Sequence, residues 1–216
     1  MLNLVLTTGL DRKRAQSLRR FGATALAGMV LLTTVSEAAF IVSSMPIVPG
    51  GSSVTVPLTS AAAGTLLATL KSPFSFVTTA GTTSGTLLSA VYQNPSGTLD
   101  FYYQITNNAS SATSLSRESS NSFTGFATNV AFRLDGSTLS GAGFVNGSIL
   151  PLTAERDTSA VGFNFVPVPA GTKISPGTST VILIISTNAV IFTAGNAEVI
   201  DGGAQTVASF RPLFQD

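Results

Sequence analysis

Acid–base chemistry in this sequence depends on carboxylates alone, because its 216 residues include no histidine and no cysteine. The absence of these residue types excludes Ser-His-Asp and Cys-His catalysis, histidine ligation of metals and thiolate metal sites. A glycoside hydrolase needs only two carboxyl groups, held about 5 to 10 Å apart across a cleft. Six acidic residues are candidates for such a pair: Asp100, Asp135, Glu155, Asp157, Glu198 and Asp201.

The closest spacing of two candidates occurs in Glu155-Arg156-Asp157. In an extended strand both acids would lie on one face, opposite the arginine. A solvated strand end or turn is the preferred interpretation, because acids scattered over a β-rich surface form such pairs by chance. Asp100, on the strand face opposite Phe101, could pair with a Lys or Arg of a neighbouring strand, and we interpret it as a structural residue. We therefore predict no catalytic residues and no cofactor.

Binding sites have weaker signals. Asp135-Gly136-Ser137 and Asp201-Gly202-Gly203 offer oxygen ligands for calcium, but they lack the dense acidic spacing of a dedicated loop, and turns are the preferred interpretation. Whether the chain binds a metal stays open. Asn108-Ala109-Ser110 and Asn146-Gly147-Ser148 match the glycosylation sequon. Four phenylalanines suggest a platform for sugar stacking, although without any Trp core packing is favoured: Phe123, Phe126, Phe132 and Phe144.

The elements that would position these residues are strands. Residues 98–106 alternate with a period of two, which places Leu99, Phe101, Tyr103 and Ile105 on one face. The run Val181-Ile182-Leu183-Ile184-Ile185 is apolar at every position, as is typical of a central strand covered on both faces. The same alternation predicts half-buried strands at Val54 to Leu58, Phe74 to Phe76, Val130 to Leu134 and Val161 to Phe165.

Turn signals rich in Gly, Pro and Asn separate these runs at short intervals, and they favour an all-β fold. We predict an antiparallel β-sandwich of about eight to eleven strands, of the jelly-roll or immunoglobulin-like kind. Ala61 to Leu70 is the one stretch that could form a turn of helix. Asn107 to Asn121, rich in Ser and Asn with Arg117 and Glu118 in its middle, is expected to be a long loop containing a short edge strand.

The first forty residues have the pattern of a secretory signal peptide. Basic residues between Arg12 and Arg20 precede an apolar stretch from Phe21 to Val35, which is too short for a comfortable membrane span. Small residues follow, and cleavage by the general secretory route is expected after Ala38 or Ala39. This gives a signal peptide over residues 1–39, with its helix, and a single β-sandwich domain over residues 40–216. The alternative is an uncleaved signal anchor.

Cleavage would change the charge of the protein. Five of the 11 basic and two of the ten acidic residues would leave, so the remaining chain would have six basic and eight acidic residues and a net charge of −2. No basic patch for phosphates would remain, and we expect neither nucleic-acid binding nor membrane association after cleavage.

Several strand and turn segments form a recognisable pattern that spans most of the chain after residue 40. They are Gly97 to Asn107, Phe123 to Val130, Ala160 to Phe165, Pro176 to Thr180, Ser186 to Ala189 and Val199 to Gly203. This pattern resembles a group of bacterial exported proteins of unknown function that often end in a PEP-CTERM sorting signal. The resemblance implies a surface or extracellular-matrix component displayed with exopolysaccharide, and it carries no catalytic residues. The Pro-Glu-Pro motif is absent after Pro212, so plain secretion or retention by contact is expected here.

Three classes of function are compatible with these patterns. The leading hypothesis is a non-enzymatic secreted or cell-surface protein associated with extracellular polysaccharide or with other surface proteins. The alternatives are a carbohydrate- or calcium-binding module, and a surface filament subunit that self-assembles by strand addition, for which Phe40 to Val48 is the only candidate donor strand. A hydrolase with two carboxylates ranks last.

Overall fold

The computed structural model describes residues 43–51, 53–165 and 172–214, which belong to a compact unit, Ser36–Asp216. The expected signal peptide and its cleavage site lie outside the described residues, as does most of the candidate donor segment. Among the described residues, no helix has the length and apolar character needed to cross a membrane.

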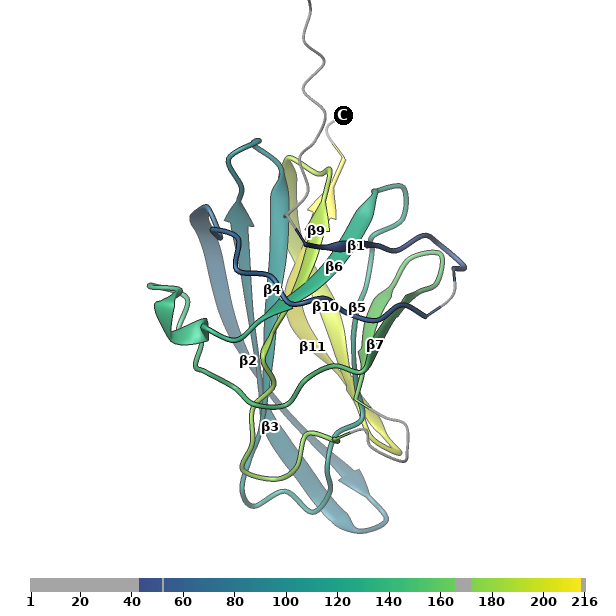
Figure 1. Ribbon diagram of the computed structural model, residues 1–216. Coiled ribbons are helices and arrows are strands. Elements are labelled where there is room, and N and C mark those ends of the chain that lie inside the picture. The colour runs from purple at the N-terminus through teal and green to yellow at the C-terminus, as the bar shows by residue number, and fades with distance from the viewer. Residues whose placement is uncertain (1–42, 52, 166–171, 215–216) are drawn as a thin grey trace, which may run out of the picture. The chain divides into compact units, whose positions relative to one another are not determined.

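The described residues form two antiparallel β-sheets, and this confirms the predicted all-β class, the antiparallel pairing and the number of strands (Figure 1). The six-stranded sheet has the order β1 (Met45–Pro46), β6 (Thr128–Arg133), β9 (Ile182–Thr187), β4 (Leu99–Asn107), β3 (Gly81–Gln93) and β2 (Thr65–Thr78). The five-stranded sheet has the order β11 (Ala204–Leu213), β10 (Ile191–Ile200), β5 (Arg117–Ser120), β8 (Val161–Asn164) and β7 (Thr153–Arg156). One short 3₁₀ helix, η1, spans Gly136–Thr138.

One hydrophobic core takes side chains from both sheets. β4 supplies the predicted row of Leu99, Phe101, Tyr103 and Ile105, all fully buried, and Phe163 of the other sheet belongs to the same cluster. The predicted central strand is β9, which lies between β6 and β4. Its alternate residues pack on the outer face of the six-stranded sheet, where the segment after β6 covers them. This second cluster explains why the run is apolar at every position.

The N-terminal segment closes one side of the molecule. Met45 and Pro46 pair with β6 of the six-stranded sheet. The chain then crosses to β7 of the five-stranded sheet, where Val54 exchanges two backbone hydrogen bonds of 2.8 Å with Ala154. It returns to β6 through a bridge between Leu58 and Phe132. A single segment therefore satisfies the edges of both sheets on this side.

On the other side, the edge strands β2 and β11 face each other. The Ser72 hydroxyl donates to the Ala208 carbonyl over 2.7 Å, and the Ser75 amide donates to the side chain of Gln205 over 2.5 Å. Residues two apart in a strand direct their amides to the same side, so Pro73 of β2 and Pro212 of β11 also lie on these facing edges. A proline has no N–H to offer an incoming strand, which protects both edges further.

Three expectations about local structure are wrong. Ala61 to Leu70 forms no helix, because Thr65–Thr78 pairs along its length with β3. Val54 to Leu58 makes isolated bridges rather than a strand, since it passes from one sheet to the other. The strand within Asn107 to Asn121 is not at an edge: β5 lies between β10 and β8. Three of its four polar residues are buried, whereas the sequence pattern indicated exposure.

Arg156 of β7 joins the two sheets through the interior. Its guanidinium donates to the carbonyl oxygens of Phe123 (2.6 Å) and Phe126 (2.9 Å) and to the hydroxyl of Thr128 (2.7 Å), where β6 begins. The side chain is almost completely buried, and its burial lowers the pKa of the guanidinium. A buried charge held by carbonyl dipoles in this way fixes the path of the chain between residues 123 and 128.

Replacing Arg156 with Met should lower the free energy of unfolding by about 2 to 4 kcal/mol, because three buried acceptors lose their donor. Urea denaturation at neutral pH measures the loss. The control is Arg117→Met, which breaks a partly exposed ion pair on the same sheet and should cost less than about 1 kcal/mol. Equal losses in the two variants would contradict the role given to Arg156.

Candidate functional site

The two acids of Glu155-Arg156-Asp157 have separate structural contacts. Glu155 forms an ion pair with Arg117 of β5. Asp157 accepts the backbone amides of Ser159 and Ala160, each over 2.6 Å, and so closes the turn between β7 and β8. These two amide hydrogen bonds lower the pKa of the Asp157 carboxyl. The two acids therefore have different partners, Glu155 on β5 of the same sheet and Asp157 in its own turn.

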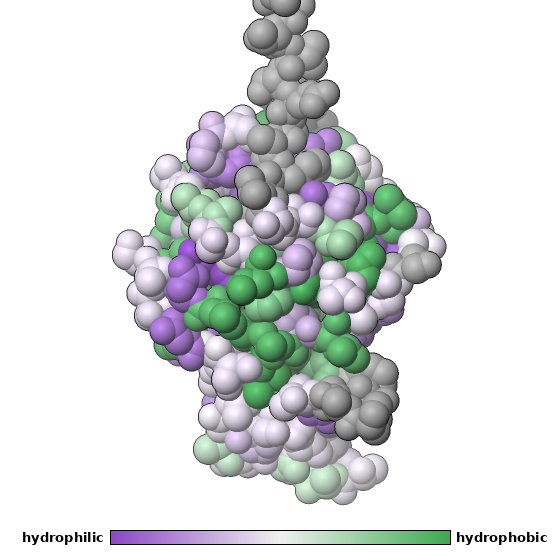
Figure 2. Space-filling model, in the orientation of Figure 1, coloured by the Kyte–Doolittle hydropathy of each residue, from purple (hydrophilic) through white to green (hydrophobic). Residues whose placement is uncertain are grey.

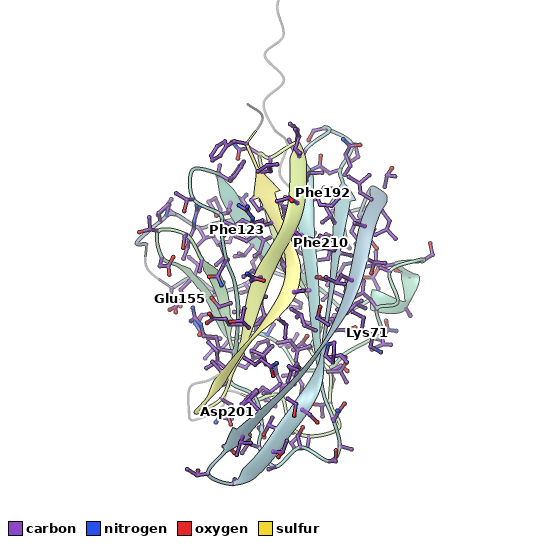
Figure 3. All side chains as sticks on the ribbon, turned by 180° about the vertical axis from the view of Figure 1, so that it is seen from behind. Lys71, Phe123, Glu155, Phe192, Asp201 and Phe210 are labelled. Atoms are coloured by element: carbon purple, nitrogen blue, oxygen red, sulfur yellow. The ribbon has the colours of Figure 1, made fainter. Side chains whose placement is uncertain are left out.

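The candidate calcium loops contain ion pairs. Asp135 receives two hydrogen bonds from the Arg133 guanidinium, of 2.7 and 2.8 Å, and these lower the pKa of Asp135 to about 2. Asp201 pairs with Lys173 over 2.9 Å. No group of three or more acidic, histidine or cysteine side chains that could hold a metal occurs within the described residues. Figure 3 shows Glu155 and Asp201 in different parts of the five-stranded sheet.

Asp100 is fully buried in the six-stranded sheet, and no Lys or Arg of the described residues forms an ion pair with it. Its carboxylate accepts a hydrogen bond from the Ser186 hydroxyl on β9, and the side-chain amide of Asn94 lies 3.5 Å from both oxygens. Burial raises the pKa of Asp100 to about 6. Asp100 therefore links β4 to β9 and to the turn that precedes β4.

Glu118 of β5 is the ionisable residue that the sequence analysis missed. It is fully buried between the sheets, where one carboxyl oxygen accepts the Ser120 hydroxyl over 2.6 Å and the other has no hydrogen-bond partner. Burial raises the pKa of Glu118 to about 8, and it also raises that of Tyr103, which faces it from β4. Its burial could not be predicted from the sequence, because Glu118 lies in a Ser- and Asn-rich stretch typical of an exposed loop.

The described surface includes five hollows of about 280 to 470 Å³ that are lined by no described Asp or Glu. Their walls consist of small, apolar and hydroxyl-bearing side chains, two side-chain amides and three basic residues. Lys71 lines one hollow, Arg133 lines another, and Arg211 lines two. Carboxylate chemistry therefore has no cleft in any of these places.

Figure 2 shows apolar side chains gathered on the face where the N-terminal segment crosses β6. One of the hollows lies here, lined by Phe132, Leu150 and Leu152 among others. Leu58 and Val145 add further apolar surface, about half exposed in each case. No charged residue lines this hollow, so the face is suited to contact rather than to chemistry.

The four phenylalanines considered as a sugar platform do not form one. Phe123 and Phe144 are buried in two different clusters, and Phe132 packs partly against the main core. Phe126 is nearly buried but stacks on Phe214, with ring centroids 4.2 Å apart and an angle of 18° between the rings. Phe214 is 57% exposed, and the sequence analysis did not single it out.

Both sequon asparagines lie at the surface. Asn108 is exposed and donates to the Ser84 hydroxyl over 3.0 Å. Asn146 is also exposed and accepts the Ser137 amide over 2.9 Å. Each side chain therefore helps to fix a turn.

Comparison with known proteins finds no counterpart for this chain: no protein-family model, no curated protein and no solved structure matches it.

The buried carboxyl of Glu118 predicts a pH-dependent stability. Its pKa of about 8 in the folded chain is above the unfolded value of 4.5, so the folded state keeps a proton that the unfolded state releases. The free energy of unfolding should therefore fall by about 1.4 kcal/mol per pH unit between pH 6.5 and pH 7.5. Denaturant titrations across this range measure the slope.

The variant Glu118→Gln keeps the size of the side chain and should remove that slope. Asp100→Asn is the control: it should leave the slope above pH 6.5 intact and reduce the dependence between about pH 4 and pH 6, because the pKa of Asp100 is lower. A slope that persists in Glu118→Gln would show that another group binds the proton.

Proposed function

We propose that this protein is exported and that its two sheets form a β-sandwich, of the jelly-roll or immunoglobulin-like kind, which serves as a non-enzymatic component of the cell surface or extracellular matrix. In this role it associates with exopolysaccharide or with other surface proteins. Export rests on the signal pattern of residues 1–39, and the matrix role rests on the resemblance to PEP-CTERM-type proteins.

One observation carries the non-catalytic part of the proposal. The five hollows named above are lined by no carboxylate of the described residues. Four of the six candidate acids hold ion pairs or turns at separate places, and a fifth, Asp100, is buried within a sheet. A two-carboxylate hydrolase needs both groups in one cleft. What the described surface offers instead is hydroxyl-bearing, weakly charged strand faces on a core with covered edges, which suits a durable scaffold.

The filament alternative has less support from the geometry. Strand addition needs an edge with free backbone groups. Here the N-terminal segment occupies the edges of β6 and β7, and Met45–Pro46, from the candidate donor segment, pairs within its own chain. The facing strands β2 and β11 restrict the other edges.

Fractionation of the producing cell tests the proposal, with mass spectrometry of the mature N-terminus. We expect an N-terminus near Phe40, with the protein in the medium or bound to extracellular polysaccharide. An intact N-terminus in the inner membrane would contradict export with cleavage.

Turnover assays of the same material test the absence of catalysis. Polysaccharide and ester substrates should stay unchanged. Hydrolysis by the wild-type protein that is lost in Glu155→Gln or Asp157→Asn would replace the scaffold proposal with a hydrolase.

A further inference from the structure

Two of the surface hollows adjoin each other around Arg211, near the end of β11. The first, of about 280 Å³, is lined by Ser122, Phe126, Arg211 and Phe214 among others. The second, of about 470 Å³, is lined by Ser122, Ala194, Gly195, Asn196 and Arg211. Ser122 and Arg211 line both hollows, and we call the two hollows together the Arg211 depression.

Arg211 has no ion pair within the described residues. The ion pairs there join Arg117 to Glu155, Arg133 to Asp135 and Lys173 to Asp201. Arg211 instead donates from its Nε to the carbonyl of Ala194 over 3.3 Å, which orients the guanidinium and leaves its two terminal nitrogens for a ligand. An arginine fork matches a carboxylate in a planar, bidentate manner.

Gly195 provides the space in which Arg211 lies. A Cβ at this position would come within 2.8 Å of the Arg211 Cβ and 3.0 Å of its Cγ. The arginine side chain therefore lies directly over a glycine of the paired strand, and any other residue would displace it. The strand interior is a costly place for glycine, and this contact is a physical reason for it.

The first hollow also has an aromatic wall, the partly exposed ring of Phe214. Phe214 stacks on Phe126, and Gly125, at a positive φ of 81°, allows the ring to approach: a Cβ there would lie 2.5 Å from the Phe214 ring. Phe126 covers one face of the ring, and Phe214 as a whole is still 57% exposed. An exposed aromatic face packs well against the apolar face of a flat ring.

The remaining lining residues are uncharged hydrogen-bonding groups. Asn196 and Ser122 supply an amide and a hydroxyl, and Ser122 adopts a φ of 74°, which is uncommon for a residue other than glycine. No carboxylate of the described residues lines the depression. Two described acids lie two residues from a lining residue. Asp157 is occupied by the amides of Ser159 and Ala160. Glu198 of β10 lies beyond Asn196 and does not line either hollow. The local charge is therefore positive on a chain whose described acids outnumber its described bases.

We propose that the Arg211 depression binds an acidic sugar unit, with the guanidinium paired to a uronate carboxylate and the exposed ring of Phe214 stacked on a sugar ring. The hydroxyl and amide groups of Ser122 and Asn196 would meet the sugar hydroxyls. This inference rests on the proposed function and gives it a ligand class, an anionic exopolysaccharide. The Arg211 guanidinium alone would bind any anion. The adjoining ring of Phe214 favours an anion that contains a sugar ring.

The test is binding of the full-length mature chain to three uronate polymers, polygalacturonate, alginate and hyaluronate, with dextran as the neutral comparison. Affinity electrophoresis or calorimetry at low salt should show binding to at least one uronate polymer and none to dextran. Arg211→Gln should weaken binding about tenfold or more, because a charge-assisted contact is lost. Phe214→Ala should weaken it about fivefold.

The matched control is Lys71→Gln, which removes an equal charge from a different hollow and should change affinity less than twofold. Gly195→Ala retains every ligand-binding group but displaces Arg211, so it should weaken binding as Arg211→Gln does. Thermal melting of each variant shows whether it is folded. If Arg211→Gln does not fold, the affinity of Phe214→Ala tests the site instead. Phe214 is exposed and lies at the end of the described chain, so its replacement should leave the fold intact.

Several outcomes would overturn the site. These are binding to none of the three polymers, equal losses in Arg211→Gln and Lys71→Gln, and full competition by polyglutamate, which would identify an acidic peptide as the ligand. None of them would alter the expected cellular fraction or mature N-terminus. Failure of the site and failure of the proposed matrix role are therefore distinguishable.

Discussion

The two sheets depend on the crossing of the segment from Met45 to Leu58. Hydrogen bonds join it to β6 at both ends and to β7 in its middle, so that one stretch of backbone belongs to both sheets. With no cysteine in the sequence, covalent cross-links cannot do this. Side-chain burial alone holds two sheets together but leaves their edges open, and a backbone segment that bridges the edges solves both problems at once. The hydroxyl and amide contacts between β2 and β11 complete the closure on the other side.

Buried polar groups set the relative position of the strands once the core has formed. Apolar contacts tolerate sliding, but Arg156 must find the carbonyls of residues 123 and 126, and Asp100 must find Ser186 on β9. Each such group is costly to bury without its partner, so alternative registers are penalised. Glu118 is also buried, and it is accommodated in its protonated, neutral form. Protonation removes the charge that burial disfavours, and the Ser120 hydroxyl donates a hydrogen bond to one of its oxygens. The interior is thus specified by a few polar contacts within a large apolar core.

The sequence predicted the positions of those strands whose apolar residues follow a regular period. Alternation located β4, β6 and β8, and continuous apolarity located β9 as a central strand, because these patterns reflect burial of one or two strand faces. Periodicity failed where a strand buries polar residues. β5 contains Arg117, Glu118, Ser119 and Ser120, and its composition is that of a loop although three of the four residues are buried. It also failed at Ala61 to Leu70, where pairing with β3 over a long hairpin overrides local helix propensity.

The Arg211 depression could not be predicted from the sequence, for a different reason. Its parts come from the loop after β5, from β10 and from the end of β11, and no spacing along the chain relates them. Gly125 and Gly195 would be read as a turn residue and a weak strand residue, yet each adjoins a large side chain that needs the missing Cβ. Only 10% of the sequence is charged, and within the described residues most charged side chains form ion pairs or are buried. An arginine held over a glycine, beside an exposed aromatic ring and without a carboxylate, is therefore better explained by a ligand than by stability, since a surface cation without a partner contributes little to folding.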